Sequence, residues 1–192
     1  MPDTQAATQD LLAARRPHRA DARRNFDALL AAARAAFTES GTDVSLEDIA
    51  KRAGVGIGTL YRNFPTREDL VECVYIDEVD GLSRAAADVA SREPWEALSA
   101  WLERFVDYVA TKHALLSALN KGSETMVAAR GALYAAGNPI LARAQEAGEV
   151  RADTSIQDLM MLVLAVTNGT FVDDAQRARV LAMALDGIRI RD

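Results

Sequence analysis

The sequence predicts an all-α fold, and three observations support that prediction. Its segments are rich in alanine and leucine and poor in runs of β-branched residues, which favours helices over strands. Within these segments, apolar residues recur at the helical period. Serine, threonine or aspartate stands before several segments and glycine after several, as at helix starts and ends. About nine helices fit in the chain of 192 residues.

The first clear helix is expected over residues 20–40. Its apolar positions follow the helical period, and Gly41 then gives a stop signal. Residues 1–18 form a polar, alanine-rich segment with arginines near its end. We therefore expect a flexible basic arm ahead of this helix.

Residues 45–64, SLEDIAKRAGVGIGTLYRNF, contain the most informative pattern of the chain. Ser45 suits a helix N-cap, and the apolar positions after it follow the helical period. Gly54 stands where a left-handed backbone would end this helix, a conformation that glycine adopts freely. A second short helix is then expected over residues 59–64.

This second helix has one apolar face and one polar face. Leu60 and Phe64 are four residues apart and therefore share the buried face. The side chains left facing outward are those of Thr59, Tyr61, Arg62 and Asn63. A helix-turn-helix of this kind lays its second helix in the major groove of DNA, where residues near its N-terminus contact base edges.

The net charge of −6 conceals an uneven distribution. Residues 15–64 include nine basic and six acidic residues, a net charge of +3, whereas residues 65–192 include thirteen basic and twenty acidic residues, a net charge of −7. Residues 15–64 thus form a basic region, the head, and residues 65–192 form an acidic body. Electrostatic attraction would orient such a protein with its head towards phosphates. The charge distribution therefore agrees with a DNA partner, although the chain as a whole is acidic.

The stretch VSLEDIAKRAGVGIGTLYRNFPTREDLVECVY resembles the DNA-binding domain of the TetR family of transcriptional regulators. The resemblance begins near Arg19 and continues to about Tyr75. The positions that match the family pattern are Ala50, Ala53, Gly54, Val55, Gly58, Thr59, Tyr61, Phe64 and Arg67. The chain departs from the family at Gly56 and Ile57, where many members have serine or a basic residue.

The polar face and the resemblance together give a set of candidate DNA-binding residues. The hydroxyl of Tyr61 can donate to a phosphate, and Arg62 can hold a guanine edge or a phosphate. By resemblance, Arg67 matches the family's phosphate-contacting basic position. The full set is Arg19, Ser45, Gly58, Thr59, Tyr61, Arg62, Asn63 and Arg67. The arm arginines either enter the minor groove or only keep the arm soluble, and the sequence favours neither interpretation.

Beyond a helix-turn-helix domain over residues 19–65, the sequence predicts a helical body over residues 66–192. Its helices are expected over residues 67–90, 94–112, 114–120, 124–147, 155–169 and 174–188. Gly137-Asn138-Pro139 lies inside one of them and favours a break there. By resemblance, this body is a ligand-binding and dimerisation domain.

Aromatic side chains mark a candidate ligand site in the body. Trp101, Phe105 and Tyr108 recur on one helix face, and Met126 and Tyr134 stand on a later helix where they can face it. Pockets between helices are usually apolar with a few polar groups. Such a pocket would take an apolar or aromatic small molecule. An aromatic stripe is also what an ordinary core requires, and the sequence leaves both interpretations open.

The last two helices contain a candidate dimer interface. Its residues are Leu159, Leu162, Val163, Val166, Val180, Met183, Ala184 and Gly187. The resemblance implies that these helices form a four-helix bundle between two subunits. The other interpretation is that they only cover the core of one subunit.

Other classes of protein find little support in the sequence. No run of about 18 uncharged apolar residues is present to span a membrane, and the start lacks the regions of a signal peptide. The single cysteine permits no internal disulfide. His18 and His113 are far apart with no second ligand at metal spacing. We expect a cytoplasmic protein without a metal, a cofactor or catalytic residues.

The sequence therefore predicts a homodimeric transcriptional repressor that binds a pseudo-palindromic double-stranded DNA operator and is released by a small molecule. One alternative is a helical small-molecule-binding or scaffold protein with weak or lost DNA binding, which the departure at Gly56 and Ile57 keeps open. Another is an all-α enzyme, which the absence of a catalytic constellation disfavours.

Overall fold

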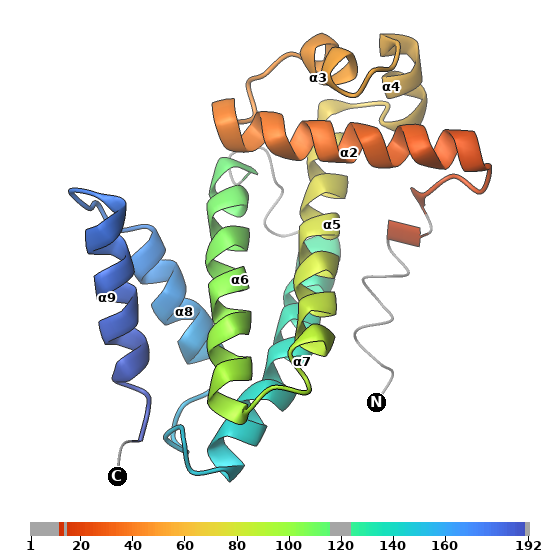
Figure 1. Ribbon diagram of the computed structural model, residues 1–192. Coiled ribbons are helices and arrows are strands. Elements are labelled where there is room, and N and C mark those ends of the chain that lie inside the picture. Colours follow the sequence, from red (N-terminus) through yellow and green to blue (C-terminus); the bar gives the residue numbers. More distant parts are fainter. Residues whose placement is uncertain (1–11, 14, 116–123, 191–192) are drawn as a thin grey trace. The chain divides into compact units, whose positions relative to one another are not determined.

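The computed structural model describes residues 12–13, 15–115 and 124–190, and the all-α prediction is confirmed there (Figure 1). The helices of this part of the chain are α2 (Ala20–Ser40), α3 (Leu46–Arg52), α4 (Ile57–Asn63), α5 (Arg67–Asp88), α6 (Pro94–Leu115), α7 (Glu124–Glu146), α8 (Ile156–Thr167) and α9 (Asp174–Asp186). Val150 and Arg189 add an isolated antiparallel bridge.

Packing divides the chain into two compact units. Unit 1 comprises Met1–Asp80 and Ala110–Ala129, and unit 2 comprises Gly81–Val109 and Arg130–Asp192. The long helices α5, α6 and α7 each continue from one unit into the other. The predicted domain boundary at residue 65 stays a prediction.

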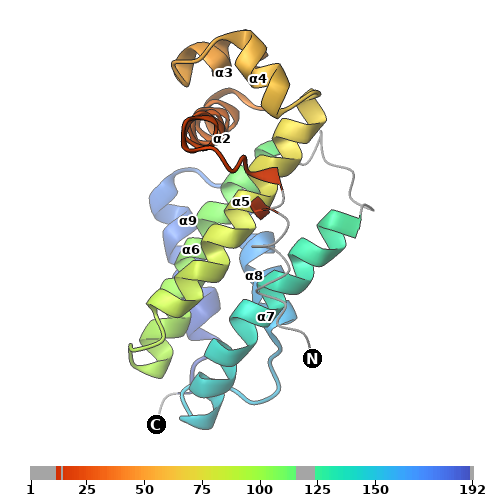
Figure 2. The ribbon, with the colours of Figure 1, turned by 90° about the vertical axis from the view of Figure 1, so that its right-hand side faces the viewer.

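In unit 1, α2 braces the two short helices that follow it. Figure 2 shows α2 nearly end-on, with α3 and α4 on one side of it. The rings of Phe26 on α2 and Phe64 after α4 lie 5.0 Å apart, and both residues are buried. Arg34 on α2 forms ion pairs with Asp77 and Glu78 on α5. The aromatic contact therefore packs the end of α4 against α2, and the ion pairs join α2 to α5.

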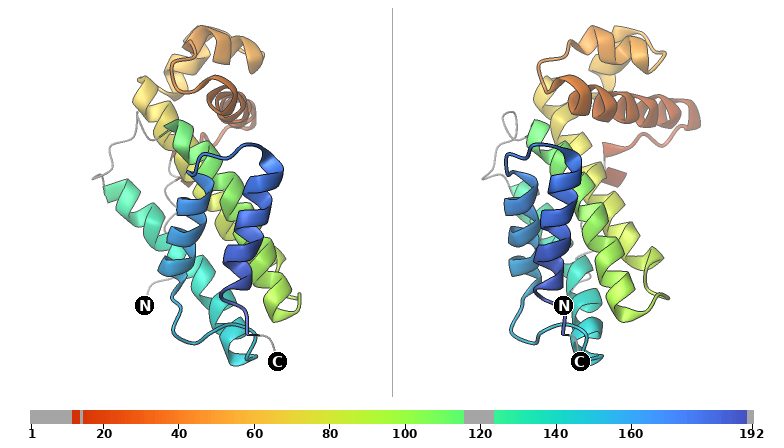
Figure 3. Two further views of the ribbon diagram at one scale, coloured as in Figure 1. Left: turned by 90° about the vertical axis from the view of Figure 1, so that its left-hand side faces the viewer. Right: turned by 60° about the vertical axis from the view of Figure 1, so that its left-hand side comes forward.

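In unit 2, Trp101 on α6 lies at the centre of the core. Its ring is fully buried, and its Nε1–H donates to the carbonyl of Leu82 at 3.1 Å. A Cβ added to Gly137 on α7 would lie 2.6 Å from Cη2 of this ring. Glycine at this position therefore lets α7 pass close to the indole. In the same unit, α8 and α9 lie side by side (Figure 3).

The expected break in α7 is wrong, because the helix continues through Pro139 from Glu124 to Glu146. Close packing of Gly137 against Trp101 explains why a glycine stands there without ending the helix. Other bounds shift by a few residues. The fifth expected helix ends at Leu115 rather than near Lys112, and most of the short helix expected over residues 114–120 lies outside the described residues.

Several helix ends have residues that commonly start or stop helices. Pro94 opens α6, and Gly148 follows α7 with a φ of 73°. Ser155 and Asp158 form a reciprocal capping box at the start of α8. Each of these residues satisfies or removes a backbone group that the helix end would otherwise leave without a partner.

Candidate nucleic-acid interface

The turn between α3 and α4 has the backbone that its glycine predicts. Gly54 has a φ of 69°. Its N–H donates to the carbonyl of Lys51 at 3.1 Å, and the N–H of Val55 donates to the carbonyl of Ala50 at 3.0 Å. These two bonds make a Schellman motif, which reverses the chain at the end of α3. The left-handed glycine therefore fixes the direction in which α4 leaves α3.

The start of α3 is fixed by a cap. The side chain of Ser45 accepts a hydrogen bond from the N–H of Asp48 at 3.0 Å. Ser45 was predicted both to cap the helix and to touch DNA, and the structure establishes the first of these roles. Its contact with DNA stays a prediction.

Helix α4 presents the predicted polar face to solvent. Leu60 is fully buried under the helix, whereas the side chain of Tyr61 is 47% exposed and Arg62 is also exposed. The helix begins at Ile57, two residues earlier than expected, so Gly58 lies in its first turn. A Cβ added to Gly58 would meet nothing within 4 Å. The backbone at Gly58, in the first turn of α4, is therefore open to close approach by a large molecule.

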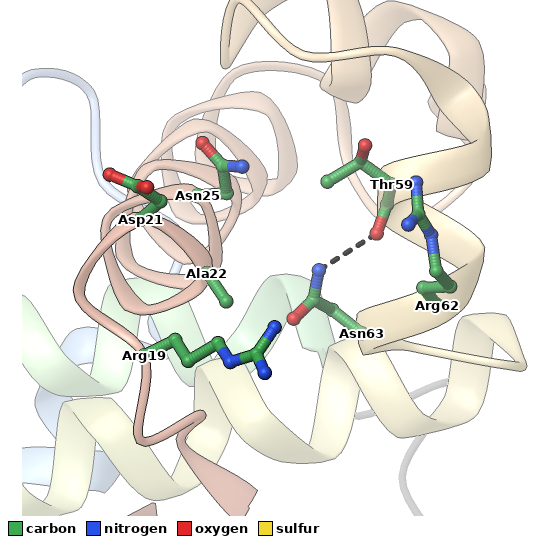
Figure 4. Close-up of a pocket in the computed structure, with 7 residues that line it drawn as sticks. All are labelled: Arg19, Asp21, Ala22, Asn25, Thr59, Arg62 and Asn63. Atoms are coloured by element: carbon green, nitrogen blue, oxygen red, sulfur yellow. Dashed lines mark hydrogen bonds between the residues drawn. The ribbon is translucent and has the colours of Figure 1, made fainter.

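A groove of about 370 Å³ lies beside this face, between the start of α2 and α4 (Figure 4). It is lined by Arg19, Asp21, Ala22, Asn25, Thr59, Arg62 and Asn63. The Nδ2 of Asn63 donates to the carbonyl of Thr59 at 2.8 Å, and the guanidinium of Arg19, the N-cap residue before α2, points towards Asn63. Two guanidiniums and two amides around one groove suit a phosphate or a base edge.

The groove gathers four of the predicted DNA-binding residues, namely Arg19, Thr59, Arg62 and Asn63. Sequence reasoning missed Asn25, which lines it from α2. Asn25 lies six residues after Arg19, and no local pattern in α2 distinguishes it from the other polar residues of this helix. Only the packing of α2 beside α4 shows that the two residues share a groove.

Arg67 occupies a different environment from the other candidates. Its Nη1 donates to the carbonyls of Thr42 and Val44 at 2.6 and 2.8 Å, and the side chain is half-buried. The guanidinium thus holds the loop that leads into α3. The role as a phosphate contact, which came from the resemblance, stays a prediction.

The arginines of the predicted arm are engaged with carboxylates. Arg15 pairs with Glu72 at 2.6 Å, and Arg16 pairs with Asp27 at 2.8 Å. Most of residues 1–18 lie outside the described residues. Arg15 and Arg16 therefore anchor the end of this segment to α5 and α2.

Arg15 also donates to the sulfur of Cys73 at 3.3 Å. Burial raises the pKa of the Cys73 thiol, because a thiolate would be desolvated there. A buried thiol that stays protonated behaves as a small apolar side chain.

The described residues offer little for other chemistries. They contain no group of three or more histidine, cysteine, aspartate or glutamate residues placed to hold a metal ion. Among the described helices, none combines the length and hydropathy needed to cross a membrane.

The candidate ligand residues of the body are mostly buried. Trp101 and Phe105 have ring centroids 6.2 Å apart, and Phe105 and Tyr108 have centroids 5.5 Å apart, so the three rings form one stack in unit 2. Tyr134 is half-buried in the same unit, and Met126 is buried in unit 1. The stack has the contacts of a core, and its role in ligand binding stays a prediction.

The candidate interface residues of α8 and α9 separate into two groups. Leu159 and Val163 are buried within unit 2, where they pack in the core of the single chain. Met183 is 72% exposed. Met161 and Val172, which the prediction did not include, are also exposed in this unit. The remaining predicted members, all half-buried or exposed, are Leu162, Val166, Val180, Ala184 and Gly187.

Comparison with known proteins gives the same family for both parts of the chain. Residues 29–74 match the model described as bacterial regulatory proteins, tetR family. Residues 93–190 match the model described as transcriptional regulator SbtR-like, C-terminal domain. Between them, the two models leave residues 75–92 unmatched, a stretch that contains most of α5.

Solved structures and curated proteins agree with these matches. A TetR transcriptional regulator from Streptomyces coelicolor is 38% identical, with a TM-score of 0.76 over 87% of this chain and 99% of that one. A TetR transcription regulatory protein from Mycobacterium vanbaalenii is 36% identical, with a TM-score of 0.73 over 91% and 100%. An HTH-type transcriptional regulator from Staphylococcus aureus is 28% identical over 123 residues, which cover 60% of this chain and 64% of that protein.

Proposed function

Because this chain belongs to the TetR family of transcriptional regulators, we propose that it is a homodimeric repressor which binds a pseudo-palindromic DNA operator and is released by a small molecule. The observation that supports this proposal best is the exposed polar face of α4 beside the groove at α2. In this proposal the chain is a regulator rather than an enzyme, and it acts in the cytoplasm, where its operator is.

The proposed DNA contact begins with α4 in the major groove. Tyr61 and Arg62 project from the exposed face, and the open backbone at Gly58 lets the duplex approach. The groove with Arg19 then receives a phosphate or the edge of a flanking base. Each phosphate contact by an arginine releases counterions, so the affinity should fall steeply as the salt concentration rises.

The proposed dimer uses the exposed apolar side chains of α8 and α9. Met161 is 63% exposed and Met183 is 72% exposed, so each helix leaves an apolar side chain in water in the single chain. Covering them with a second copy of the same helices removes this surface from water. A two-fold dimer then offers two α4 helices to half-sites about 34 Å apart along the DNA.

The proposed effector is an apolar or aromatic molecule with one or two polar groups. Its binding among the aromatic residues of the body would favour a spacing of the two heads that no longer fits adjacent major grooves. The effector would thereby shift the population away from the DNA-binding state. Among the candidate ligand residues in unit 2, Tyr134 is half-buried and accessible to solvent, whereas the others are buried.

The proposal is tested by letting the purified full chain select duplexes from a random pool. We expect enrichment of a two-fold symmetric sequence and a light-scattering mass of two chains. Met183→Arg should lower that mass to one chain and weaken operator binding, because a charge would be buried at the interface. The exposed Val127 on α7 provides a control, since Val127→Arg should leave the mass unchanged. Failure to enrich any sequence would favour the alternative of a small-molecule-binding protein that has lost DNA affinity.

A further inference from the structure

We propose that Ile57 is a specificity-determining residue which contacts the methyl group of a thymine in each operator half-site. This inference rests on the proposed function, because it needs α4 to lie in the major groove. Ile57 is the first residue of α4, and its side chain is 36% exposed. It occupies the position at which a recognition helix contacts base edges.

Ile57 and Tyr61 are the exposed large apolar side chains among the described residues of the segment up to Asp80. They are four residues apart and therefore share one flank of α4. The flank that faces the groove holds Thr59 and Asn63 instead. Helix α4 thus has a polar flank and an apolar flank on either side of its exposed face.

The two neighbours of Ile57 in the chain leave open space on both sides of it. Gly56 precedes it as the N-cap and Gly58 follows it, so neither neighbour has a side chain. A Cβ added to Gly56 or to Gly58 would meet nothing within 4 Å, which means that the space on both sides is open. Ile57 is therefore the only side chain in the stretch from Gly56 to Gly58.

The chemistry of base edges favours thymine as the partner of this side chain. In the major groove, the methyl group of thymine is the one apolar group, and cytosine has a C5–H in its place. Isoleucine has no polar group, so it cannot bond the polar edge of either base and gains only from contact with the methyl group. Against thymine it removes more apolar surface from water than against cytosine. The same side chain therefore prefers thymine to cytosine.

The environment of Ile57 favours DNA over a protein partner. Residues 15–64 have a net charge of +3, and Arg62 is exposed on the same helix. A stable protein interface needs roughly 800 Å² from each partner, more than two side chains supply. A base edge in a groove matches the size of this apolar flank.

The experiment is a uracil scan of the duplex that the full chain selects from a random pool. Each thymine is replaced in turn by uracil, which removes only the methyl group, and symmetric positions are replaced together. At one position, we expect the affinity of the natural chain to fall about fourfold per half-site. Ile57→Ala should lose this sensitivity, so that the thymine and uracil duplexes bind it equally. Val127→Ala, which truncates another exposed aliphatic side chain of unit 1, should keep it.

Melting curves establish that Ile57→Ala is folded, and light scattering establishes its mass without DNA. A uracil scan with no sensitive position would overturn the proposal, as would a sensitive position that Ile57→Ala leaves unchanged. A change of mass in Ile57→Ala would assign the residue to a protein interface and would also overturn it. If the natural chain selects no duplex at all, the proposed function has failed, and this outcome differs from a flat scan on a duplex that binds.

Discussion

Helices α4 and α6 each contain a spaced set of side chains that the sequence marks as functional, yet the structure treats the two sets in opposite ways. On α4, Tyr61 and Arg62 face solvent, and the apolar Leu60 is buried. On α6, Trp101 and Phe105 are both buried, at 0% and 4% exposure. The exposed set on α4 is available to a partner, whereas the set on α6 already has protein partners.

The difference shows which patterns point to function. Polar side chains on the outer face of a short helix contribute little to folding, so their pattern beside a left-handed glycine needs another explanation. Aromatic side chains at helical spacing are what a core needs in any case. The Nε1–H of Trp101 is satisfied by the carbonyl of Leu82, so even its polar group has a structural partner.

The strongest way to break this comparison is Trp101→Ala. If the indole is a core residue, its removal should lower the free energy of unfolding by about 3–5 kcal/mol, because it leaves a large cavity. Operator affinity and effector release should then decline together. Urea unfolding and operator titration on the same preparation measure both quantities. Trp101→Phe keeps an aromatic ring but loses the bond to Leu82. Its free energy of unfolding should lie between those of the natural chain and Trp101→Ala.

A different result for Trp101→Ala would show that α6, like α4, presents side chains to a partner. Stability within about 1 kcal/mol of the natural chain, together with selective loss of effector release, would identify Trp101 as a ligand residue. The buried stack would then open in the effector-bound state.

Variants of Arg67 test whether every basic residue near α4 contacts DNA. Its Nη1 bonds to the carbonyls of Thr42 and Val44, so Arg67→Ala should cost about 1.5–3 kcal/mol of stability, the usual range for hydrogen bonds to a charged group. Arg67→Lys keeps the charge but replaces the planar guanidinium, whose Nη1 reaches both carbonyls, by an ammonium on a stem of different length and geometry. If the residue acts on the loop, both variants should lose stability, as measured by urea unfolding.

The salt dependence of operator binding separates this role from a phosphate contact. A phosphate contact predicts that Arg67→Ala lowers the slope of log K against log salt by about one per half-site, while Arg67→Lys keeps it. An unchanged slope in Arg67→Ala, with reduced stability, would leave the loop as the sole role of Arg67.

The sequence predicted those elements whose chemistry is local. Gly54 ends α3 with the expected left-handed backbone, and Thr66 and Asp69, three residues apart, form reciprocal bonds at the start of α5. Long-range partners escaped it. The carbonyls that Arg67 holds are 23 and 25 residues away in the chain, and the share of Asn25 in the groove depends on how α2 packs beside α4. Residue spacing alone contains no information about such pairs.

The break expected in α7 failed for the same reason. Gly137 and Pro139 are local signals for a helix end, but the ring of Trp101 on another helix fills the space beside Gly137. Tertiary packing therefore outweighs the local preference of two residues.

A pair of glycine variants sharpens the account of the head. Gly54→Ala places a Cβ on a residue with a φ of 69° and should cost about 1–2 kcal/mol of stability. Gly58→Ala lies in a helix with open space around it, so its stability should be equal or slightly higher. Operator affinity should nevertheless fall in Gly58→Ala, because the added methyl group stands between the backbone and the DNA. Equal DNA affinity in Gly58→Ala and the natural chain would contradict close approach at this position.

The smallest expected effect belongs to Tyr61→Phe, which removes one hydroxyl from the exposed face of α4. Tyr61 is 47% exposed, so the loss of a single oxygen in Tyr61→Phe should leave the melting temperature unchanged. If the hydroxyl donates to a phosphate, operator binding should weaken by about 1 kcal/mol, or roughly fivefold, at fixed salt. Because a phosphate bond carries no sequence information, the loss should be equal on the selected operator and on a scrambled duplex. A loss confined to the operator would instead place the hydroxyl on a base edge, and an unchanged affinity would remove Tyr61 from the DNA contact.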